Sequence, residues 1–375
     1  MYEKKKILIH AFISNNLGDD LLVKMLCERY PKQAFVISLE GISSKTLRSI
    51  SNLRFSMPLY ILKKFIVLEG RLKRHLININ IFSKLEHSFS SKYEIGVYIA
   101  GSIFVQNAQK YIDKTILHNR HQMHEDFLII GANFGPYHDP RYRDFVEDQF
   151  KSVNDVCFRD SASKKFFANM VNVRWAPDVV FGLEYPIRKV KKKVVISIIK
   201  CDRSGRPNAL ASQADVYEIV IKNCCAILSQ LGYTVCLMSF CEKQGDGETV
   251  FNIDRRCKEA GISNVSVYHY KGDVDEALEI IAESERVIAT RFHMMILGWV
   301  MKKPVFPLVY DQKMTRVLED TGFFPGKKII ELKRDEAPEI VRTLLALLPV
   351  DCAMQSEESV KQFAGLDFII GGGIS

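Results

Sequence analysis

The sequence predicts an α/β protein with two domains, each built on a parallel β-sheet. Its 375 residues are more than one ordinary hydrophobic core accommodates and suit two domains of typical size. Short apolar runs typical of buried strands alternate with longer amphipathic segments typical of helices, which favours parallel sheets covered by helices. A charged, proline-containing stretch, 184–193, separates two such series. We therefore expect an N-terminal domain at 1–187, a C-terminal domain at 188–350 and a tail, 351–375, that could pack back on the N-terminal domain.

Strands are expected where β-branched and aromatic residues form short apolar runs, and helices where apolar residues recur at helical spacing. In the first series the expected strands are 6–11, 34–38, 95–100, 127–132 and 156–159, and the expected helices are 20–30, 140–153 and 162–170. In the second series the expected strands are 194–199, 234–239, 265–268, 286–289 and 305–309, and the expected helices are 214–231, 247–260, 273–283, 292–301 and 335–348.

Composition narrows the class of protein. A hydrophobic content of 47% and a charged content of 26% are those of a soluble globular protein. The apolar run near the start is short and contains His10, so it is interpreted as the first strand and not as a signal peptide. Nine scattered cysteines without metal-ligand spacing favour reduced thiols in the cytoplasm and predict no metal site.

Positive charge is concentrated in one segment. The chain carries a formal net charge of +8, and residues 45–92 hold ten Lys/Arg against two acids, which is also +8 (10 − 2). This segment is also amphipathic, so it could contact anionic lipid at the inner face of the membrane or an acidic glycan carrier. An ordinary solvated basic face is the alternative that we favour. Nucleic acid is not expected as a partner, because no nucleic-acid-binding motif accompanies the charge.

The most informative stretch, 286–311, reads as a strand, a helix and a second strand. Thr290 is expected to cap the helix, which places Arg291 and His293 in its first turn. Free N–H groups and the helix dipole attract anions there. Arginine adds a planar fork for a carboxylate or phosphate, and histidine can bind the same anion or transfer a proton. The alternative is a pair of solvated polar residues before a core helix.

Further candidates follow the ends of other expected strands, where open α/β sheets bind ligands. Two such Rossmann-like domains with their strand ends facing one interdomain cleft would form a glycosyltransferase-B-like arrangement. Each candidate could equally supply ordinary turn or capping chemistry; His138 could act on an acceptor hydroxyl or be a surface-loop histidine. The candidate substrate-binding residues are Asn16, Gly18, Asp19, Gly101, Ser102, Gly135, His138, Asp160, Ser161, Phe292, Tyr310, Asp311 and Lys313, with Arg159 beside Asp160.

Two motifs carry a family resemblance. Thr290-Arg-Phe-His293, followed by an apolar helix, Lys-Pro-Val and then Val309-Tyr-Asp-Gln-Lys313, resembles the C-terminal signature of the polysaccharide pyruvyltransferases. Arg159-Asp160-x-x-Ser163 is similar to a second element of that family. The resemblance spans roughly residues 5–345, although the family's glycine-rich turn is reduced here to Ala100-Gly101-Ser102.

The resemblance implies an enzyme that transfers pyruvate from phosphoenolpyruvate to a sugar diol of a surface polysaccharide, or of its lipid-linked precursor, as a ketal. Arg159 and Arg291 would grip the donor's carboxylate and phosphate, and His293 would be the general acid or only an anion ligand. No cofactor is implied beyond the donor. Two alternatives remain open: a glycosyltransferase that uses a nucleotide sugar, since function does not follow from fold, and a non-catalytic assembly subunit at the membrane surface.

Overall fold

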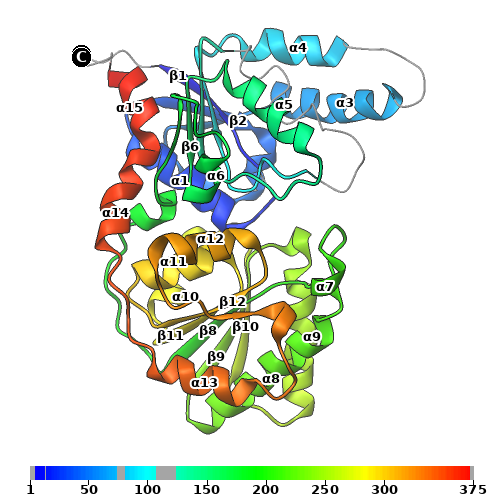
Figure 1. Cartoon of the computed structure of the whole chain (residues 1–375), viewed down its shortest axis with the longest axis vertical. Helices are drawn as coiled ribbons and strands as arrows, with labels where there is room; N and C mark the ends of the chain where they lie inside the picture. Colours follow the sequence, from blue (N-terminus) through cyan, green and yellow to red (C-terminus); the bar gives the residue numbers. More distant parts are fainter. Residues whose placement is uncertain (1–4, 13, 74–80, 107–123, 372–375) are drawn as a thin grey trace. The chain divides into compact units, whose positions relative to one another are not determined.

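The computed structural model describes residues 5–12, 14–73, 81–106 and 124–371 and consists of two compact units (Figure 1). The first unit comprises Met1–Ser14, Leu22–Val179 and Val360–Ser375. The second comprises Asn15–Leu21 and Val180–Ser359, so a short N-terminal segment belongs with the C-terminal domain. This assignment places residues from the start of the chain in the same unit as the helix that follows Arg291.

The first unit is built on a seven-stranded parallel sheet of order β3-β2-β1-β4-β5-β6-β7. The expected strands are all present. Two additional edge strands, β3 and β7, were not expected because they lack the continuous apolar run of the buried strands. The strands are β1 Lys6–His10, β2 Ala34–Ser38, β3 Leu53–Ser56, β4 Ile95–Ile99, β5 Asp126–Ala132, β6 Asp155–Phe158 and β7 Val173–Trp175.

The second unit is built on a six-stranded parallel sheet of order β10-β9-β8-β11-β12-β13. Its five long strands are those expected, and β13 is a two-residue addition at the edge. The strands are β8 Lys193–Ile198, β9 Thr234–Ser239, β10 Val265–His269, β11 Arg286–Ala289, β12 Val305–Val309 and β13 Lys327–Lys328. The expected fold class, two Rossmann-like α/β domains with parallel sheets, is therefore confirmed.

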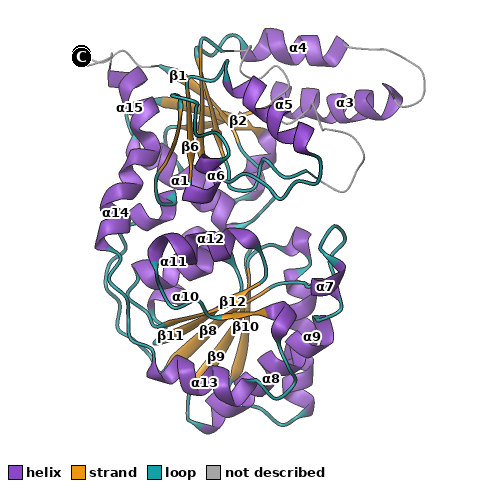
Figure 2. Ribbon diagram, in the orientation of Figure 1, coloured by secondary structure: helices purple, strands orange, loops and turns teal. Residues whose placement is uncertain are grey.

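In the described parts of the chain, helices lie in most of the connections between the parallel strands (Figure 2). In the first unit they are α1 Leu17–Arg29, whose first turn belongs to the second unit, α2 Lys45–Ser49, α3 Met57–Lys73, α4 Ile81–Ser90, α5 Pro140–Phe150, α6 Ser161–Lys165 and α15 Ala364–Gly371. In the second unit they are α7 Asn208–Ala211, α8 Ala214–Gln230, α9 Asp246–Glu259, α10 Val274–Ala282, α11 Phe292–Val300, α12 Gln312–Thr321, α13 Ala337–Ala346 and α14 Ala353–Ser359.

One helix prediction is wrong in extent. The helix expected over 162–170 ends at Lys165, after little more than one turn. Phe167 is 1% exposed and stacks on Phe158 at a ring-centroid distance of 5.7 Å, so the chain leaves the helix to place this ring in the core. Tertiary packing of an aromatic residue outweighs helix propensity here.

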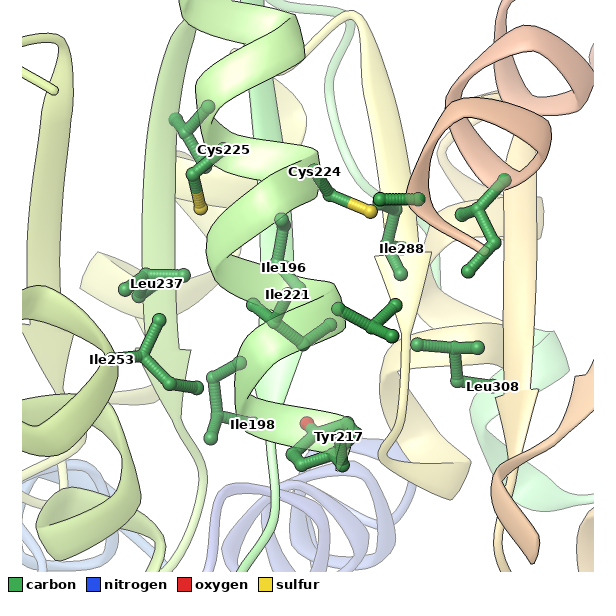
Figure 3. Packing of buried hydrophobic residues seen from close by; sticks show 14 of the residues in the cluster. Ile196, Ile198, Tyr217, Ile221, Cys224, Cys225, Leu237, Ile253, Ile288 and Leu308 are labelled. Atoms are coloured by element: carbon green, nitrogen blue, oxygen red, sulfur yellow. The ribbon is translucent and has the colours of Figure 1, made fainter. Parts of the chain in front are cut away.

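The core of the second unit lies between its sheet and helices α8, α9 and α13 (Figure 3). Ile196 and Leu237 of the sheet meet Ile221 of α8, and all three side chains are fully buried. Cys224 and Cys225 of α8 point into the same layer as free thiols. This packing fixes the strands whose carboxyl ends carry the residues described below.

Candidate functional site

The start of α11 is fixed by the end of strand β8. Ser197 Oγ accepts the backbone N–H of Thr290 at 2.9 Å and that of Arg291 at 3.1 Å. The expectation that Thr290 caps the helix is wrong: its hydroxyl donates to the Ser197 carbonyl, and Arg291 is the N-cap residue. Thr290 is fully buried, so its hydroxyl needs a partner inside the fold and finds one on the neighbouring strand.

Arg291 does not cap the helix with its side chain, because its guanidinium turns toward α9. Nη1 donates to Gln244 Oε1 at 2.7 Å, and Nη2 donates to Asp246, which is fully buried. The other oxygen of Asp246 accepts the N–H groups of Phe240 at 3.2 Å and Cys241 at 3.0 Å. Burial raises the pKa of Asp246, and Arg291 offsets this effect in part. The guanidinium is thus held in one orientation before any ligand arrives.

His293 lies against Gly18 in the second unit. A Cβ atom at Gly18 would overlap the imidazole at Nδ1, Cε1 and Cγ, so only glycine leaves room for this ring. Asn16 Oδ1 accepts the N–H of Gly18 at 3.1 Å. The start of α1 is also held by Tyr270, whose hydroxyl donates to Asp20 at 2.6 Å. Gly18 therefore leaves space for the His293 ring, in addition to forming the turn that its sequence context suggested.

Two further candidate residues, Asp19 and Phe292, lie beside Gly18 and His293. Asp19 is half-buried in the first turn of α1, beside Gly18. Phe292 is 4% exposed and packs edge-on against the His293 ring at a centroid distance of 5.1 Å. Phe292 thus belongs to the core and supports the position of the imidazole.

A third group surrounds Tyr310, which follows strand β12. Asp311 caps α12 by accepting the Lys313 N–H at 3.1 Å, and Lys313 Nζ lies 5.3 Å from the centre of the Tyr310 ring. Arg206, from the loop after β8, stacks on the same ring with Cζ at 4.6 Å. Asp311 therefore caps a helix, as one of its two alternatives predicted. Lys313 is one of two cations beside the tyrosine.

Arg159 lies at the end of β6 in the first unit and is 3% exposed. Its Nη1 donates to Asp178 Oδ2 at 3.1 Å and its Nη2 donates to Asn133 Oδ1 at 2.6 Å. A Cβ atom at Gly101 would lie only 2.6 Å from both terminal nitrogens, so the guanidinium rests on this glycine. Ser102 Oγ also donates to Asn133 Oδ1, at 3.2 Å. The salt-bridge partner of Arg159 is the buried Asp178, and not its neighbour Asp160.

Asp160 and Ser163 of the Arg-Asp-x-x-Ser motif hold the backbone. Asp160 caps α6 by accepting the Ser163 N–H at 2.7 Å, and it also accepts the Ser163 hydroxyl at 2.8 Å. Ser163 Oγ accepts the N–H of Phe134 at 2.8 Å, which fixes the turn before Gly135. Ser161 is half-buried in the first turn of α6.

The turn that contains Gly135 is also stabilised by the segment that follows β4. The Gly135 N–H donates to Phe104 O at 2.7 Å, and its φ of 85° suits glycine. His138, two residues beyond Pro136, is exposed, and its backbone N–H donates to Gln106 Oε1 at 2.7 Å. The structure thus leaves the His138 side chain at the surface of the first unit.

Gln362, from the C-terminal tail, joins the same edge of the first sheet. Its Nε2 donates to the carbonyls of Ala176 at 2.7 Å and Phe158 at 3.1 Å, and its Oε1 accepts the Gly131 N–H at 3.0 Å. One buried amide therefore connects the ends of β5, β6 and β7 beside Arg159. No local sequence pattern points to this residue, which lies about two hundred positions from its partners.

The predicted residues thus form separate groups. The first unit brings together Gly101, Ser102 and Arg159, and the second brings together Gly18, His293 and Arg291 with its partners. Asp246, Gln244 and Arg206 were missed. A Gly245-Asp246-Gly247 step directly before a helix was the only sequence signal for the acid. Across the described ranges, no three His, Cys, Asp or Glu side chains gather as a metal would require, and no helix has the length and apolarity to cross a bilayer.

Comparisons with known proteins agree with this architecture. The family model described as polysaccharide pyruvyl transferase matches residues 16–312. The fold resembles UDP-GlcNAc 2-epimerase from Methanocaldococcus jannaschii, with 8% identity, a TM-score of 0.54, and coverage of 96% of this chain and 99% of that one. An alpha,alpha-trehalose 6-phosphate synthase from Burkholderia multivorans has 9% identity, a TM-score of 0.49, and coverage of 98% and 94%. None of the curated proteins compared with the chain matches it.

Proposed function

This chain belongs to the polysaccharide pyruvyl transferase family and is a transferase, and from this premise we propose that it transfers pyruvate from phosphoenolpyruvate to a sugar diol. Two hydroxyl oxygens form bonds to C2 of the donor, and the C2–O bond to phosphate breaks. One hydroxyl proton ends on C3, which becomes a methyl group, and the other leaves on the phosphate. The products are a cyclic ketal that carries a carboxylate, and inorganic phosphate.

The observation that carries this proposal is the pairing of a pre-oriented arginine with a histidine at the start of α11. Arg291 is fixed by Asp246 and Gln244, so its remaining N–H groups offer an anion site that needs no rearrangement. We propose that Arg291 binds the donor and that His293 delivers the proton to C3 or to the departing phosphate. The contact with Gly18 supports this role, because it gives the imidazole a defined position.

We propose that the first unit binds the sugar acceptor at the edge of its own sheet. Arg159 brings a positive charge to the turns that contain Gly101 and Ser102, and Asp178 and Asn133 hold that charge in place. The sugar acceptor, free or lipid-linked, would approach this edge, as ligands do in open α/β sheets. We propose no metal ion in the reaction, since arginine and lysine side chains supply the positive charge that the donor requires.

The test is release of phosphate from phosphoenolpyruvate in the presence of acceptor, together with a mass increase of one pyruvyl group on the acceptor. His293→Ala should lose turnover while the protein remains folded by circular dichroism. Arg291→Lys is the better second variant, because Arg291→Ala would leave Asp246 buried without its cation. Turnover like that of the wild type in both variants would refute the assignment. Thermal stabilisation by a nucleotide sugar and not by phosphoenolpyruvate would favour a glycosyltransferase instead.

The acceptor chemistry bears on the basic segment 45–92, of which 74–80 lie outside the described residues. On α3, Met57, Ile61 and Phe65 follow one another at helical spacing and are 50%, 44% and 41% exposed. The exposed Lys64 lies among them. We propose that this face contacts anionic lipid when the acceptor is lipid-linked, since apolar and basic side chains together suit a membrane surface.

Co-sedimentation with phosphatidylglycerol vesicles tests the lipid contact. Ile61→Glu should weaken binding, whereas Leu231→Glu, at a leucine of the second unit with 45% exposure, should not. Equal binding by both variants would refute the proposed surface.

A further inference from the structure

The loop that follows strand β8 brings a third cation to the group around Tyr310. Arg206 Cζ lies 4.6 Å from the centre of the Tyr310 ring, and Lys313 Nζ lies 5.3 Å from the same centre. Arg291 is close enough to interact electrostatically with the tyrosine as well. Positively charged side chains from the loop after β8, from the N-cap of α11 and from the first turn of α12 therefore act on one phenol.

The cations differ in how far their charge is already balanced. Arg291 is paired with the buried Asp246, and Lys313 Nζ lies 3.6 Å from a carboxylate oxygen of Asp311. Arg206 has no carboxylate within salt-bridge distance anywhere in the described parts of the chain. Its Nε is buried and, within those parts, has no hydrogen-bond partner. A buried guanidinium N–H without an acceptor costs free energy unless a ligand supplies one.

Arg291 has the same feature. Its Nε is also buried without a hydrogen-bond partner in the described parts of the chain, although both of its terminal nitrogens are engaged. Two arginines near Tyr310 thus each keep one N–H group unused inside the fold. Each of these N–H groups could donate to an oxygen of a bound oxyanion.

The loop of Arg206 is anchored beside the loop that holds Arg291. Lys200 packs its side-chain carbons against Gly245, where a Cβ atom would lie only 2.6 Å from Lys200 Cδ. Gly245 has a φ of 83° and directly follows Gln244, the acceptor for Arg291. Lys200 Nζ then donates to Glu248 at 2.6 Å. The start of the loop that carries Arg206 therefore lies against the loop that holds Arg291.

The same positive charges affect the pKa of Tyr310. Burial alone would raise the pKa of its hydroxyl, but Lys313, Arg291 and Arg206 hold the pKa below its ordinary value. An environment that favours a phenolate also favours other anions. The acid nearest in sequence, Asp311, does not reverse this effect.

We propose that Arg206 binds the phosphate group of the donor, with Lys313 and the Nε of Arg291 as its neighbours and the Tyr310 ring as the surface on which its guanidinium is stacked. This inference rests on the proposed function for the identity of the donor. A phosphate dianion fits better than a lone carboxylate, because it has enough oxygens to accept from several cations at once. Other residues would then bind the donor's carboxylate.

Kinetics on the full-length protein test the proposal. Arg206→Gln should raise KM for phosphoenolpyruvate by about ten- to a hundred-fold, the usual effect of losing a charge-assisted hydrogen bond, with a smaller change in kcat. Arg206→Lys should recover part of this loss. Arg203→Gln removes an equal charge from an exposed position of the same loop and should leave KM unchanged.

Two inhibitors separate a phosphate ligand from a residue with a purely structural role. Inorganic phosphate should inhibit Arg206→Gln far more weakly than the wild type, whereas pyruvate, which carries only the carboxylate, should inhibit both alike. Equal weakening of both inhibitors, or an unchanged KM, would overturn the assignment of Arg206. If the wild type fails to turn over phosphoenolpyruvate, the proposed function fails by itself. Calorimetric binding of inorganic phosphate to the wild type and Arg206→Gln then still decides whether Arg206 holds a phosphate.

Discussion

The substitution Gly18→Ala adds one methyl group next to His293, the proposed general acid. Helix propensity alone favours the change, because alanine in a helix is better than glycine by up to about 1 kcal/mol. The structure predicts the opposite for activity. The added Cβ would overlap three atoms of the His293 imidazole, which must then rotate or push the start of α1 away. Overpacking of this kind typically costs about 1–3 kcal/mol.

These two effects set the expected magnitudes. The free energy of unfolding should change by between about 0 and 2 kcal/mol in the destabilising direction, since propensity offsets part of the overpacking. Turnover should fall by about a hundred-fold or more, because a displaced acid forfeits most of the advantage of a positioned proton donor. Urea unfolding and phosphate release from phosphoenolpyruvate measure the two quantities separately. A large loss of turnover beside a small loss of stability is the result that identifies Gly18 as a positioning residue.

His293→Ala supplies the matched background. With the ring removed, the methyl group at Gly18 has room, so Gly18→Ala should stabilise this variant slightly and should not lower its residual turnover further. Such non-additivity is expected only for residues that act through one another. Full turnover in Gly18→Ala, or an equal proportional loss with and without the imidazole, would refute the reasoning.

Two further predictions concern the first unit. Asp178→Asn leaves Arg159 buried without its anion and should lower the free energy of unfolding by about 3–5 kcal/mol in urea titrations, and a change below about 1 kcal/mol would contradict the buried ion pair. His124 donates through Nδ1 to Tyr93 O at 2.7 Å and therefore accepts at Nε2, 3.2 Å from His10 Nε2. Burial lowers the pKa of His124, so its contribution to stability is complete above the ordinary histidine value of about 6.5 and is lost as the pH falls below it. Unfolding midpoints of the wild type and of His124→Phe should therefore converge between about pH 7.5 and about pH 5.5, and parallel profiles would exclude this histidine pair as the cause.

Much of the fold could be predicted because the strands are buried on both faces. Such strands are continuous apolar runs, and β9 and β12 begin and end at the expected residues. The edge strands β3, β7 and β13 were missed because they are short and lie outside this pattern. The helix at α6 was expected to be longer than it is, because local helix propensity does not indicate that Phe167 packs into the core. The sequence thus predicts elements that have a regular apolar pattern. It does not predict a helix end that depends on the packing of one side chain.

The candidate site shows the same division. Arg159 and Arg291 could be found, since they follow strand ends and match family motifs. Their partners could not, because Asp246 is 45 positions from its arginine and Asp178 is 19 positions from its own. Nothing in local sequence links an acid to a distant arginine. Arg206 was also hidden, as its loop has no motif and only the stacking on Tyr310 reveals it.

The burial of both arginine–carboxylate pairs has a consequence for how an anion could bind. An arginine that is free in solution must lose side-chain entropy of about 2 kcal/mol before it can hold a ligand. Asp246 and Asp178 remove that cost, since the guanidinium groups are already ordered. The same carboxylates cancel much of the attraction that the arginines would exert on a donor. A site that relied on Arg291 alone would therefore be well oriented but weakly charged. In the proposed site Arg206, which has no carboxylate partner in the described parts of the chain, adds positive charge for the phosphate and the carboxylate of the donor.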